Sequence, residues 1–360
     1  MRVLYVAHYR ENSGWGEAAR NYILALDKAG ADVVCRPVLF KNNAVLPDRI
    51  KELEAKSGGS FDYCIQNVLP HYMEFNGAYK KNIGQYVEDS LNIRHTSWYP
   101  KLQKMDALFG TFRIQNTRTY TKYYHIPHCF DLSIYKKDYK KLDIPRLDDK
   151  YVFYFIGEFN RRKNVGALLR AFHAAFSKTD DVALVLKLNK PGVSPQKLGE
   201  EVNNLATTIK QHLGKFSNLD KYQNEIVIPF DLPREDILRL HATGDCFVTT
   251  SYGEGWCIPA FEACAMNNKL VAPYSDPYIQ YSSNDWTLYN VNAQPMVGAE
   301  PIFPGFGNCR DSWLVPNIGE VESSLRAAVC AGKDFNSHIL YEDRFSLETV
   351  GSQMMEALND

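Results

Sequence analysis

The most informative segment of the chain reads Thr250-Ser251-Tyr252-Gly253-Glu254-Gly255-Trp256-Cys257-Ile258-Pro259-Ala260-Phe261-Glu262-Ala263. The run at 246–250 is apolar and rich in β-branched residues, which is typical of a buried strand. Two glycines then indicate a turn, and Pro259 suits the first turn of a helix, where a missing N–H costs nothing. The segment therefore predicts a strand, a loop that carries Glu254, and a helix that carries Glu262.

The predicted loop and helix start have the chemistry of an anion site. Glycine lets the backbone pass close to a ligand, and the first N–H groups of a helix have no partner within it. Because these N–H groups carry partial positive charge, they favour a phosphate. We therefore expect a phosphorylated ligand here, with binding contributions from Gly253, Gly255, Trp256 and Cys257.

Glu254 and Glu262 have seven residues between them, in the setting E-G-W-C-I-P-A-F-E-A. This pattern resembles the E-x7-E signature of retaining GT-B glycosyltransferases, specifically the GT4 group. In that family the second Glu binds the ribose hydroxyls of a nucleotide-sugar, and the first lies beside the transferred sugar. The resemblance implies these roles for Glu262 and Glu254, and a carboxylate can accept hydrogen bonds from two vicinal hydroxyls at once. Because the spacing alone is common, two solvated acids on a helix are the alternative.

A cationic turn, Glu158-Phe159-Asn160-Arg161-Arg162-Lys163-Asn164, follows another apolar run. Arginine can contact phosphate oxygens with two parallel hydrogen bonds, and lysine acts as a point charge. The turn resembles the diphosphate grip of the same family, with Lys163 matching its Lys. The usual Arg of that grip is replaced by Glu158, whose charge would repel a diphosphate. Either Glu158 turns away and Arg162, or failing that Arg161, supplies the second cation, or the affinity for the donor is lower; we expect Arg162 to supply it. The alternative is a solvated basic turn.

Composition indicates an ordinary globular protein. Of the 360 residues, 45% are hydrophobic and 23% charged, and 41 basic against 42 acidic residues give a net charge of −1. This balance predicts no nucleic-acid partner. No apolar run approaches the roughly 20 residues that cross a bilayer, so we expect a cytoplasmic protein and leave peripheral membrane contact open. The eight Cys include no CxxC pair, which favours reduced thiols over disulfides or zinc.

The N-terminal half begins with an expected strand at 2–7 and a helix from about residue 16 to 29. Gly14, Gly16 and Ala19 fit the G-x-G-x-x-A dinucleotide fingerprint. The first glycine, however, lies too far from the strand, and no acid ends the next strand, at 33–38. We therefore expect a flexible loop at Gly14 and Gly16. In the resembled family this loop lies near the donor phosphate and the acceptor; a plain strand-to-helix connection is the alternative.

Other candidates follow expected strands, because ligands of open α/β sheets collect beyond the carboxyl ends of the strands. On the acceptor side these are His71, Glu88, Asp89 and His128. On the donor side, Gly157 ends the strand before the basic turn. Pro229 and Phe230 end the expected strand at 225–230, whose surroundings contact the base in the resembled family.

The repeated β/α order predicts an α/β protein with the GT-B fold, two doubly wound Rossmann-like domains facing an interdomain cleft. We expect an acceptor-side domain at 1–145 and a nucleotide-sugar-binding domain at 146–345. Residues 346–360 are expected to form a helix, capped by Ser346, that packs back on the first domain. Residues 276–316 are expected to be irregular, as a lid or an acceptor-side element.

The resemblance implies transfer of a sugar from a UDP- or GDP-sugar to an acceptor hydroxyl with retention of configuration. It implies no cofactor and no metal, since the nucleotide-sugar is itself a substrate. The acceptor is left open among carbohydrate, lipid-linked and protein acceptors. Two alternatives remain: a nucleotide-sugar epimerase of the same fold, and a catalytically silent nucleotide- or sugar-binding protein.

Overall fold

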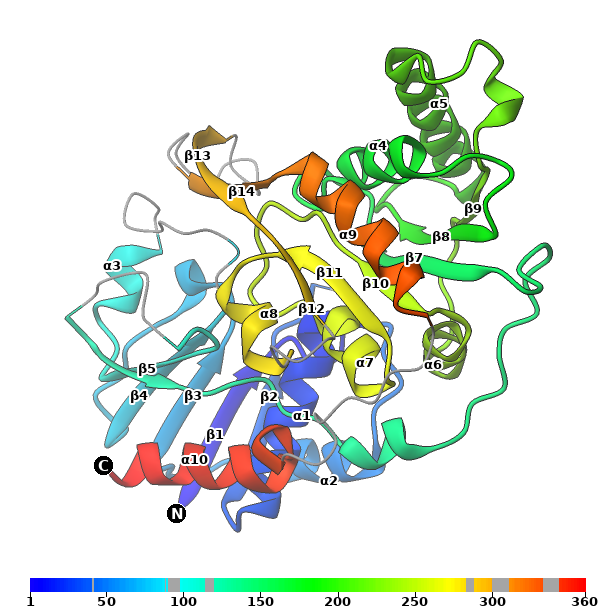
Figure 1. Cartoon of the computed structure of the whole chain (residues 1–360). Coiled ribbons are helices and arrows are strands. Elements are labelled where there is room, and N and C mark those ends of the chain that lie inside the picture. Colours follow the sequence, from blue (N-terminus) through cyan, green and yellow to red (C-terminus); the bar gives the residue numbers. More distant parts are fainter. Residues whose placement is uncertain are drawn as a thin grey trace. The chain divides into compact units, whose positions relative to one another are not determined.

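A computed structural model of the chain describes residues 1–40, 42–87, 89, 98–113, 120–282, 288–299, 311–332 and 343–360. It divides into two compact units (Figure 1). The first comprises Met1–Ile134, Val297–Ser312 and Glu342–Asp360, and the second comprises Tyr135–Met296 and Trp313–Tyr341.

The first unit is built on a parallel sheet with the strand order β2-β1-β3-β4-β5-β6. Its strands are β1 (Arg2–Ala7), β2 (Asp32–Pro37), β3 (Tyr63–Asn67), β4 (Lys81–Tyr86), β5 (Ala107–Gly110) and β6 (Lys122–His125). β2 and β3 lie on opposite sides of β1. The chain therefore reverses its direction across the sheet between β1 and β3, and ligands of open α/β sheets bind at such a switch point.

The helices of the first unit are α1 (Gly14–Lys28), α2 (Asp48–Ala55), α3 (Tyr99–Leu102) and α10 (Leu347–Asn359), with short 3₁₀ turns η1 (Pro70–Tyr72), η2 (Leu132–Lys136), which continues into the second unit, and η5 (Asp343–Phe345). The expected flexible loop at Gly14 and Gly16 is wrong, because both glycines lie in the first turn of α1. Ser13 caps this helix and accepts a hydrogen bond from the Gly16 N–H at 3.2 Å. The cap satisfies an N–H that would otherwise lack a partner, which starts the helix earlier than expected.

Helix α10 packs against α1 in the first unit, as the ribbons in Figure 1 show. The prediction that Ser346 caps this helix is confirmed, since its hydroxyl accepts from the Thr349 N–H at 3.1 Å. The two helices meet at Gly351, where an added Cβ would lie 2.1 Å from the Ala25 carbonyl oxygen. The close approach therefore depends on a residue without a side chain.

The second unit repeats the design with the order β12-β11-β10-β7-β8-β9. Its strands are β7 (Tyr151–Glu158), β8 (Val182–Asn189), β9 (Glu225–Ile228), β10 (Cys246–Val248), β11 (Lys269–Pro273) and β12 (Leu288–Val291). β7, β10 and β11 are almost entirely buried, as parallel strands covered on both faces are. Here the switch point lies between β7 and β10, which pair directly. The basic turn and the Glu254 loop follow these two strands.

The second unit also contains α4 (Val165–Ala175), α5 (Pro195–Leu213), α6 (Arg234–Thr243), α7 (Ile258–Ala265), α8 (Asp276–Tyr281), α9 (Ile318–Cys330) and the short turn η3 (Leu219–Lys221). The expectation that 276–316 is irregular is wrong for its described parts, which form α8, β12 and the pair β13 (Ala293–Ala299) and β14 (Asp311–Pro316). Its residues 283–287 and 300–310 lie outside the described residues.

Seven cysteines in the described ranges are free, and of these only Cys330 is exposed. Cys309 lies outside the described residues. Among the helices that the structure describes, none combines the length and apolar character needed to cross a membrane.

We predict that Gly351→Val weakens the packing of α10 on α1, because the new side chain collides with the Ala25 backbone. The free energy of unfolding should fall by about 1–3 kcal/mol, as for other overpacked interiors. Urea denaturation followed by circular dichroism measures this change. Gly199→Ala is the matched control in α5, where an added Cβ meets nothing within 4 Å. It should raise the stability by roughly 0.5–1 kcal/mol, and an equal response of the two variants would contradict the prediction.

Candidate active site

The basic turn after β7 and the loop after β10 are joined by a set of hydrogen bonds. The Tyr252 N–H donates to the Arg162 carbonyl at 2.8 Å. The Thr250 hydroxyl donates to the Asn164 carbonyl at 2.8 Å, and the Asn164 amide donates back to the Thr250 carbonyl at 3.1 Å. The two loops therefore form one hydrogen-bonded platform at the switch point of the sheet, although Asn164 and Thr250 are 86 residues apart in the chain.

Glu254 is buried in this platform between two cations. The Lys163 ammonium donates to its Oε1, and Arg162 Nη1 lies 3.1 Å from its Oε2. The same Arg162 nitrogen donates to the Gly253 carbonyl at 2.7 Å. Burial raises the pKa of Glu254, but Lys163 and Arg162 outweigh burial and lower it to about 2. The carboxylate is therefore ionised at neutral pH, and two cations against one anion leave an excess positive charge.

The other charged residues of the basic turn lie elsewhere. The Arg161 guanidinium lies 5.8 Å from the centre of the Trp313 ring, which stacks on Tyr252 at 5.3 Å. Glu158, the last residue of β7, is half-buried. Arg162 is therefore the arginine that contacts Glu254 beside Lys163.

Helix α7 begins directly after the platform. Its N-cap residue, Cys257, has a φ of 65°, in the left-handed region. This backbone costs a non-glycine residue about 1–2 kcal/mol, and such strain is concentrated at functional sites. The described residues with positive φ include neither Gly253 nor Gly255.

Trp256 and Cys257 are core residues. The Trp256 ring lies 5.3 Å from the Tyr281 ring, and the Tyr281 hydroxyl donates to the Trp256 carbonyl at 2.9 Å. Both side chains are buried, and burial raises the pKa of the Cys257 thiol to about 12. The ligand contacts expected of Trp256 and Cys257 stay a prediction.

Glu262 lies one turn into α7 with its side chain enclosed, and the residue is only 1% exposed. Arg234 Nη2 and the Tyr135 hydroxyl donate to its Oε1, the latter at 3.1 Å, and His241 Nε2 lies 3.3 Å from its Oε2. Burial raises the pKa of Glu262, but Arg234 and His241 outweigh burial and lower it to about 2. Glu262 is thus a second ionised carboxylate with its own partners.

A hydrogen-bonded chain continues from Glu262 through His241. His241 Nε2 donates to the carboxylate, because an ionised carboxylate can only accept. On the other side of the ring, Nδ1 is 2.8 Å from the Tyr154 hydroxyl, which accepts from the Asn268 amide at 2.7 Å. The sequence alone does not point to the partners of Glu262, because Tyr135, Arg234 and His241 lie in other elements and belong to no motif.

The partners of Glu262 bear on its predicted ribose contact. Arg234 is the most exposed of them, with 38% of its side chain accessible, whereas Tyr135 and His241 are buried. A ribose diol would therefore compete with Arg234 for the carboxylate, so the ribose contact of Glu262 stays a prediction.

The remaining donor-side candidates lie at the ends of strands. Gly157 is in β7, where an added Cβ would lie 2.7 Å from the Phe155 ring. Pro229 and Phe230 follow β9, and the Phe230 ring is exposed rather than in the core. The sequence alone does not point to Lys187, a buried residue of β8. Its ammonium lies 3.5 Å from a carboxylate oxygen of Asp231, and burial lowers the pKa of Lys187. Helix α6 begins after Pro233 without a side-chain cap.

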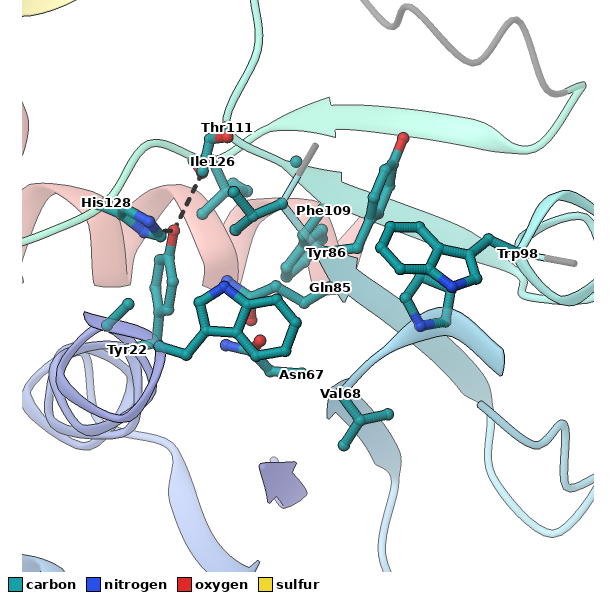
Figure 2. A pocket seen from close by; sticks show the side chains of 15 residues that line it. Tyr22, Asn67, Val68, Gln85, Tyr86, Trp98, Phe109, Thr111, Ile126 and His128 are labelled. Carbon is teal, nitrogen blue, oxygen red and sulfur yellow. Dashed lines mark hydrogen bonds between the residues drawn. The ribbon is translucent and has the colours of Figure 1, made fainter. Parts of the chain in front are cut away.

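In the first unit, His128 is one of the residues that line a small hollow (Figure 2). Its Nδ1 is 2.8 Å from the Tyr22 hydroxyl, and burial lowers its pKa to about 3. His71 lies in η1 against the Tyr72 ring, with ring centres 4.0 Å apart, and is not among the lining residues. Asp89 is half-buried, and Glu88 lies outside the described residues.

The described ranges contain no group of three or more His, Cys, Asp or Glu residues that could hold a metal ion.

Part of the chain matches a known protein family. Residues 137–273 match the sequence pattern of the family described as glycosyl transferases group 1. No curated protein matches the chain by sequence. The matched residues include both the basic turn and the Glu254–Glu262 segment.

Solved structures align over the whole chain. HepE of Anabaena in complex with UDP-glucose is 13% identical with a TM-score of 0.66, and the alignment covers 100% of this chain and 99% of that one. A sucrose-phosphate synthase of Thermosynechococcus elongatus is 13% identical with a TM-score of 0.65, covering 100% and 98%. A trehalose-6-phosphate synthase, OtsA, is 11% identical with a TM-score of 0.64, covering 100% and 99%. The chain therefore has the GT-B fold, and the predicted fold class is confirmed.

We predict that acid destabilises the second unit through Glu254 and Glu262. Because both folded-state pKa values lie near 2, below the usual value of 4.5, their contribution is complete above about pH 5 and is lost as pH falls toward 2. Glu262→Gln should cost about 1–3 kcal/mol at pH 7 and should flatten the fall of the melting temperature between pH 5 and 3. Thermal unfolding across this pH range measures both effects. Glu200→Gln, at an exposed position of α5, is the control, and a Glu262→Gln profile that parallels it would contradict the prediction.

Proposed function

We propose that the protein is a glycosyltransferase that moves a sugar from a nucleoside-diphosphate sugar to an acceptor hydroxyl with retention of configuration. The observation that carries this proposal is the convergence of Lys163 and Arg162 beside the start of α7. The glycosyl transferases group 1 match over 137–273 and the GT-B fold support it. The proposed donor site lies in the second unit, and a UDP- or GDP-sugar is the proposed donor.

The cations suit the charge that the reaction develops. The bond between the anomeric carbon and the β-phosphate oxygen breaks, which leaves positive charge on the sugar and negative charge on the departing diphosphate. Fixed positive groups beside the leaving group lower the barrier, because they are already oriented when the charge forms. Lys163, Arg162 and the first amides of α7 would supply this stabilisation without a metal ion or a cofactor.

Proton transfer completes the proposed reaction. The acceptor oxygen bonds to the anomeric carbon on the face from which the diphosphate leaves, and its proton passes to a phosphate oxygen. No protein nucleophile is then required, and the configuration is retained.

Glu254 has a dual role in this proposal. In the free protein it holds Lys163 and Arg162 at the platform. When the diphosphate binds and shares these cations, the carboxylate oxygens can accept hydrogen bonds from hydroxyls of the donor sugar. Its negative charge would also stabilise the positive sugar.

Glu262 would bind the ribose diol once Arg234 turns away. The His241 N–H and the buried Tyr135 hydroxyl would remain on the carboxylate and keep it ionised. Each carboxylate oxygen can accept two hydrogen bonds, so the ribose replaces one donor without displacing the others.

We predict that UDP or GDP raises the melting temperature of the wild type, since a ligand that binds only the folded state stabilises it. Lys163→Ala and Arg162→Ala should each lose most of this shift and lower kcat/KM by roughly 10²- to 10³-fold. Arg161→Ala is the matched control from the same turn, because its guanidinium lies over Trp313 instead. A shift of wild-type size in both Lys163→Ala and Arg162→Ala would refute the site.

We also predict that turnover persists in EDTA, since the stabilising charges belong to the protein. NMR of the product should show the anomeric configuration of the donor. Inversion of that configuration would disprove the proposed same-face transfer, and loss of activity in EDTA would disprove metal independence.

The same assays distinguish the two alternative functions. Isomerisation of the nucleotide-sugar without transfer would indicate an epimerase. Binding of the nucleotide-sugar without turnover would indicate a catalytically silent binding protein.

A further inference from the structure

We propose that Lys187 of β8 recognises the base of the donor nucleotide. It would select uracil and guanine, which carry a keto oxygen at the position it contacts, over cytosine and adenine, which carry an amino group there. This inference rests on the proposed function, and it adds the residue that determines the choice of nucleotide. The evidence comes from the burial of Lys187, its position in the sheet and the charges around it.

Lys187 is a buried cation with little compensation. Only 8% of its side chain is exposed. Within the described part of the chain, its one polar partner is a carboxylate oxygen of Asp231 at 3.5 Å, which is longer than a normal charge-assisted hydrogen bond. The Asp231 side chain is itself 81% exposed. Because an ammonium has three N–H donors and a buried charge is costly without partners, a ligand that offers an acceptor would be stabilised here.

Lys187 lies on the same face of the sheet as Glu262. Paired residues of a parallel sheet point to one face, and so do residues two apart along a strand. Lys187 pairs with Ile156 of β7 and therefore shares a face with Tyr154. The Tyr154 hydroxyl lies 2.8 Å from His241 Nδ1 of α6, and His241 contacts Glu262. This is the face that α6 covers, whereas α4 covers the other (Figure 1).

One short segment connects Lys187 with Glu262. It joins β9 to α6, and its Asp231 contacts Lys187 whereas its Arg234 contacts Glu262. Asp231 and Arg234 are three residues apart, and three residues of chain span at most about 11 Å. This span is comparable with the length of a nucleoside. A ribose bound by Glu262 would therefore place the base beside Lys187.

The opposite direction along the sheet is closed by side chains. The platform follows β7 and β10, which are flanked by β8 on one side and β11 on the other. Beyond β11 begins α8, whose Tyr278 and Tyr281 are buried. The Tyr281 hydroxyl donates to the Trp256 carbonyl at 2.9 Å. A nucleoside whose diphosphate binds the platform would therefore extend toward β8 and β9.

Phe230 offers a flat surface for the base beyond β9. It lies two residues after Ile228, which is the β9 partner of Lys187, and it is 51% exposed. Stacking on an aromatic ring tolerates every base, because every base has a π-face. Phe230 would therefore add affinity for any nucleotide, and the choice among bases would depend on Lys187.

The charges around Lys187 favour a neutral acceptor over a phosphate. Asp231 balances the charge of the ammonium, and the exposed Glu235 adds negative charge in the first turn of α6. At the platform, in contrast, two cations face one carboxylate. A phosphate would gain less at Lys187 than at the platform, whereas the keto oxygen of a base carries no net charge to be repelled.

The direction of the hydrogen bond supplies the selection. An ammonium donates hydrogen bonds and accepts none. Uracil, like thymine, presents O4 as an acceptor, and guanine presents O6, whereas cytosine and adenine present an amino donor at the same place. These groups lie on the part of the base that is remote from the ribose. With the ribose at Glu262, they are therefore the groups that would meet Lys187.

Titration calorimetry of the full-length protein with UDP, CDP, GDP and ADP tests the inference. UDP and CDP form the sharpest comparison, because they differ by an oxygen and an amino group at the position assigned to Lys187. The wild type should bind UDP roughly 5- to 100-fold more tightly than CDP, and GDP more tightly than ADP by a similar factor. If only one of these pairs binds, that pair decides. This comparison requires no variant.

Lys187→Met keeps the length of the side chain and removes its charge. This variant should bind UDP and CDP with nearly equal affinity, because the interaction with the keto oxygen is lost. Lys197→Met, at an exposed position of α5, is the matched control and should keep the preference of the wild type. Melting temperatures without nucleotide establish that each variant is folded. Lys187→Gln replaces Lys187→Met if the latter unfolds, since an amide both donates and accepts.

Phe230→Ala tests the stacking surface separately. It should weaken the binding of all four nucleotides by a similar factor and leave the ratio of UDP to CDP affinity unchanged. A change in that ratio without a general loss of affinity would contradict the role given to Phe230.

The inference on Lys187 would be overturned by a wild type without preference for UDP and GDP, or by the same preference in Lys187→Met. An equal loss of all four nucleotides in Lys187→Met would also overturn it, because that result indicates a phosphate contact or a purely structural role. Binding of the four nucleotides without preference would leave the proposed function standing. A wild type that binds none of them would count against the proposed function instead.

Discussion

The second unit depends on the joining of two loops by a buried, charged cluster. Lys163 and Arg162 contact Glu254, and hydrogen bonds between segments 160–164 and 250–254 hold the two loops together. A buried charge is costly unless it is paired, so the cluster is stable only as a set. Because β7 and β10 are adjacent at the switch point, the sheet brings the two loops side by side before any side chain contributes. The backbone topology therefore determines the location of the charge, and the charge then determines the chemistry.

The spacing of Glu254 and Glu262 separates two carboxylate environments. Glu254 lies before α7 and is paired with the turn after β7, whereas Glu262 lies inside α7 and is paired with α6 and η2. Both pKa values are lowered to about 2, but by different cations. Each acid can therefore exchange a partner for a ligand without disturbing the other, which is the arrangement that a donor with two recognised parts requires.

Sequence predicted the parts of the fold in which local pattern and burial agree. β1 was expected at 2–7 and is observed at Arg2–Ala7, because the alternation of its residues matches their burial. Long-range pairing was not predictable in this way. Arg234 and His241 of α6 and Tyr135 of η2 surround the Glu262 carboxylate, and no spacing rule joins these residues to α7. The prediction at Gly14 and Gly16 was wrong because glycines favour a loop, whereas the Ser13 side chain caps a helix that begins there.

The platform of the second unit and the hollow of the first unit differ in charge. The platform has two cations for one anion, so a diphosphate gains ion pairs there that offset its desolvation. The described lining of the hollow contains no Asp, Glu, Lys or Arg, so a diphosphate would lose its hydration there without compensation. The distribution of charge in the described residues therefore favours the platform as the site of a nucleoside diphosphate.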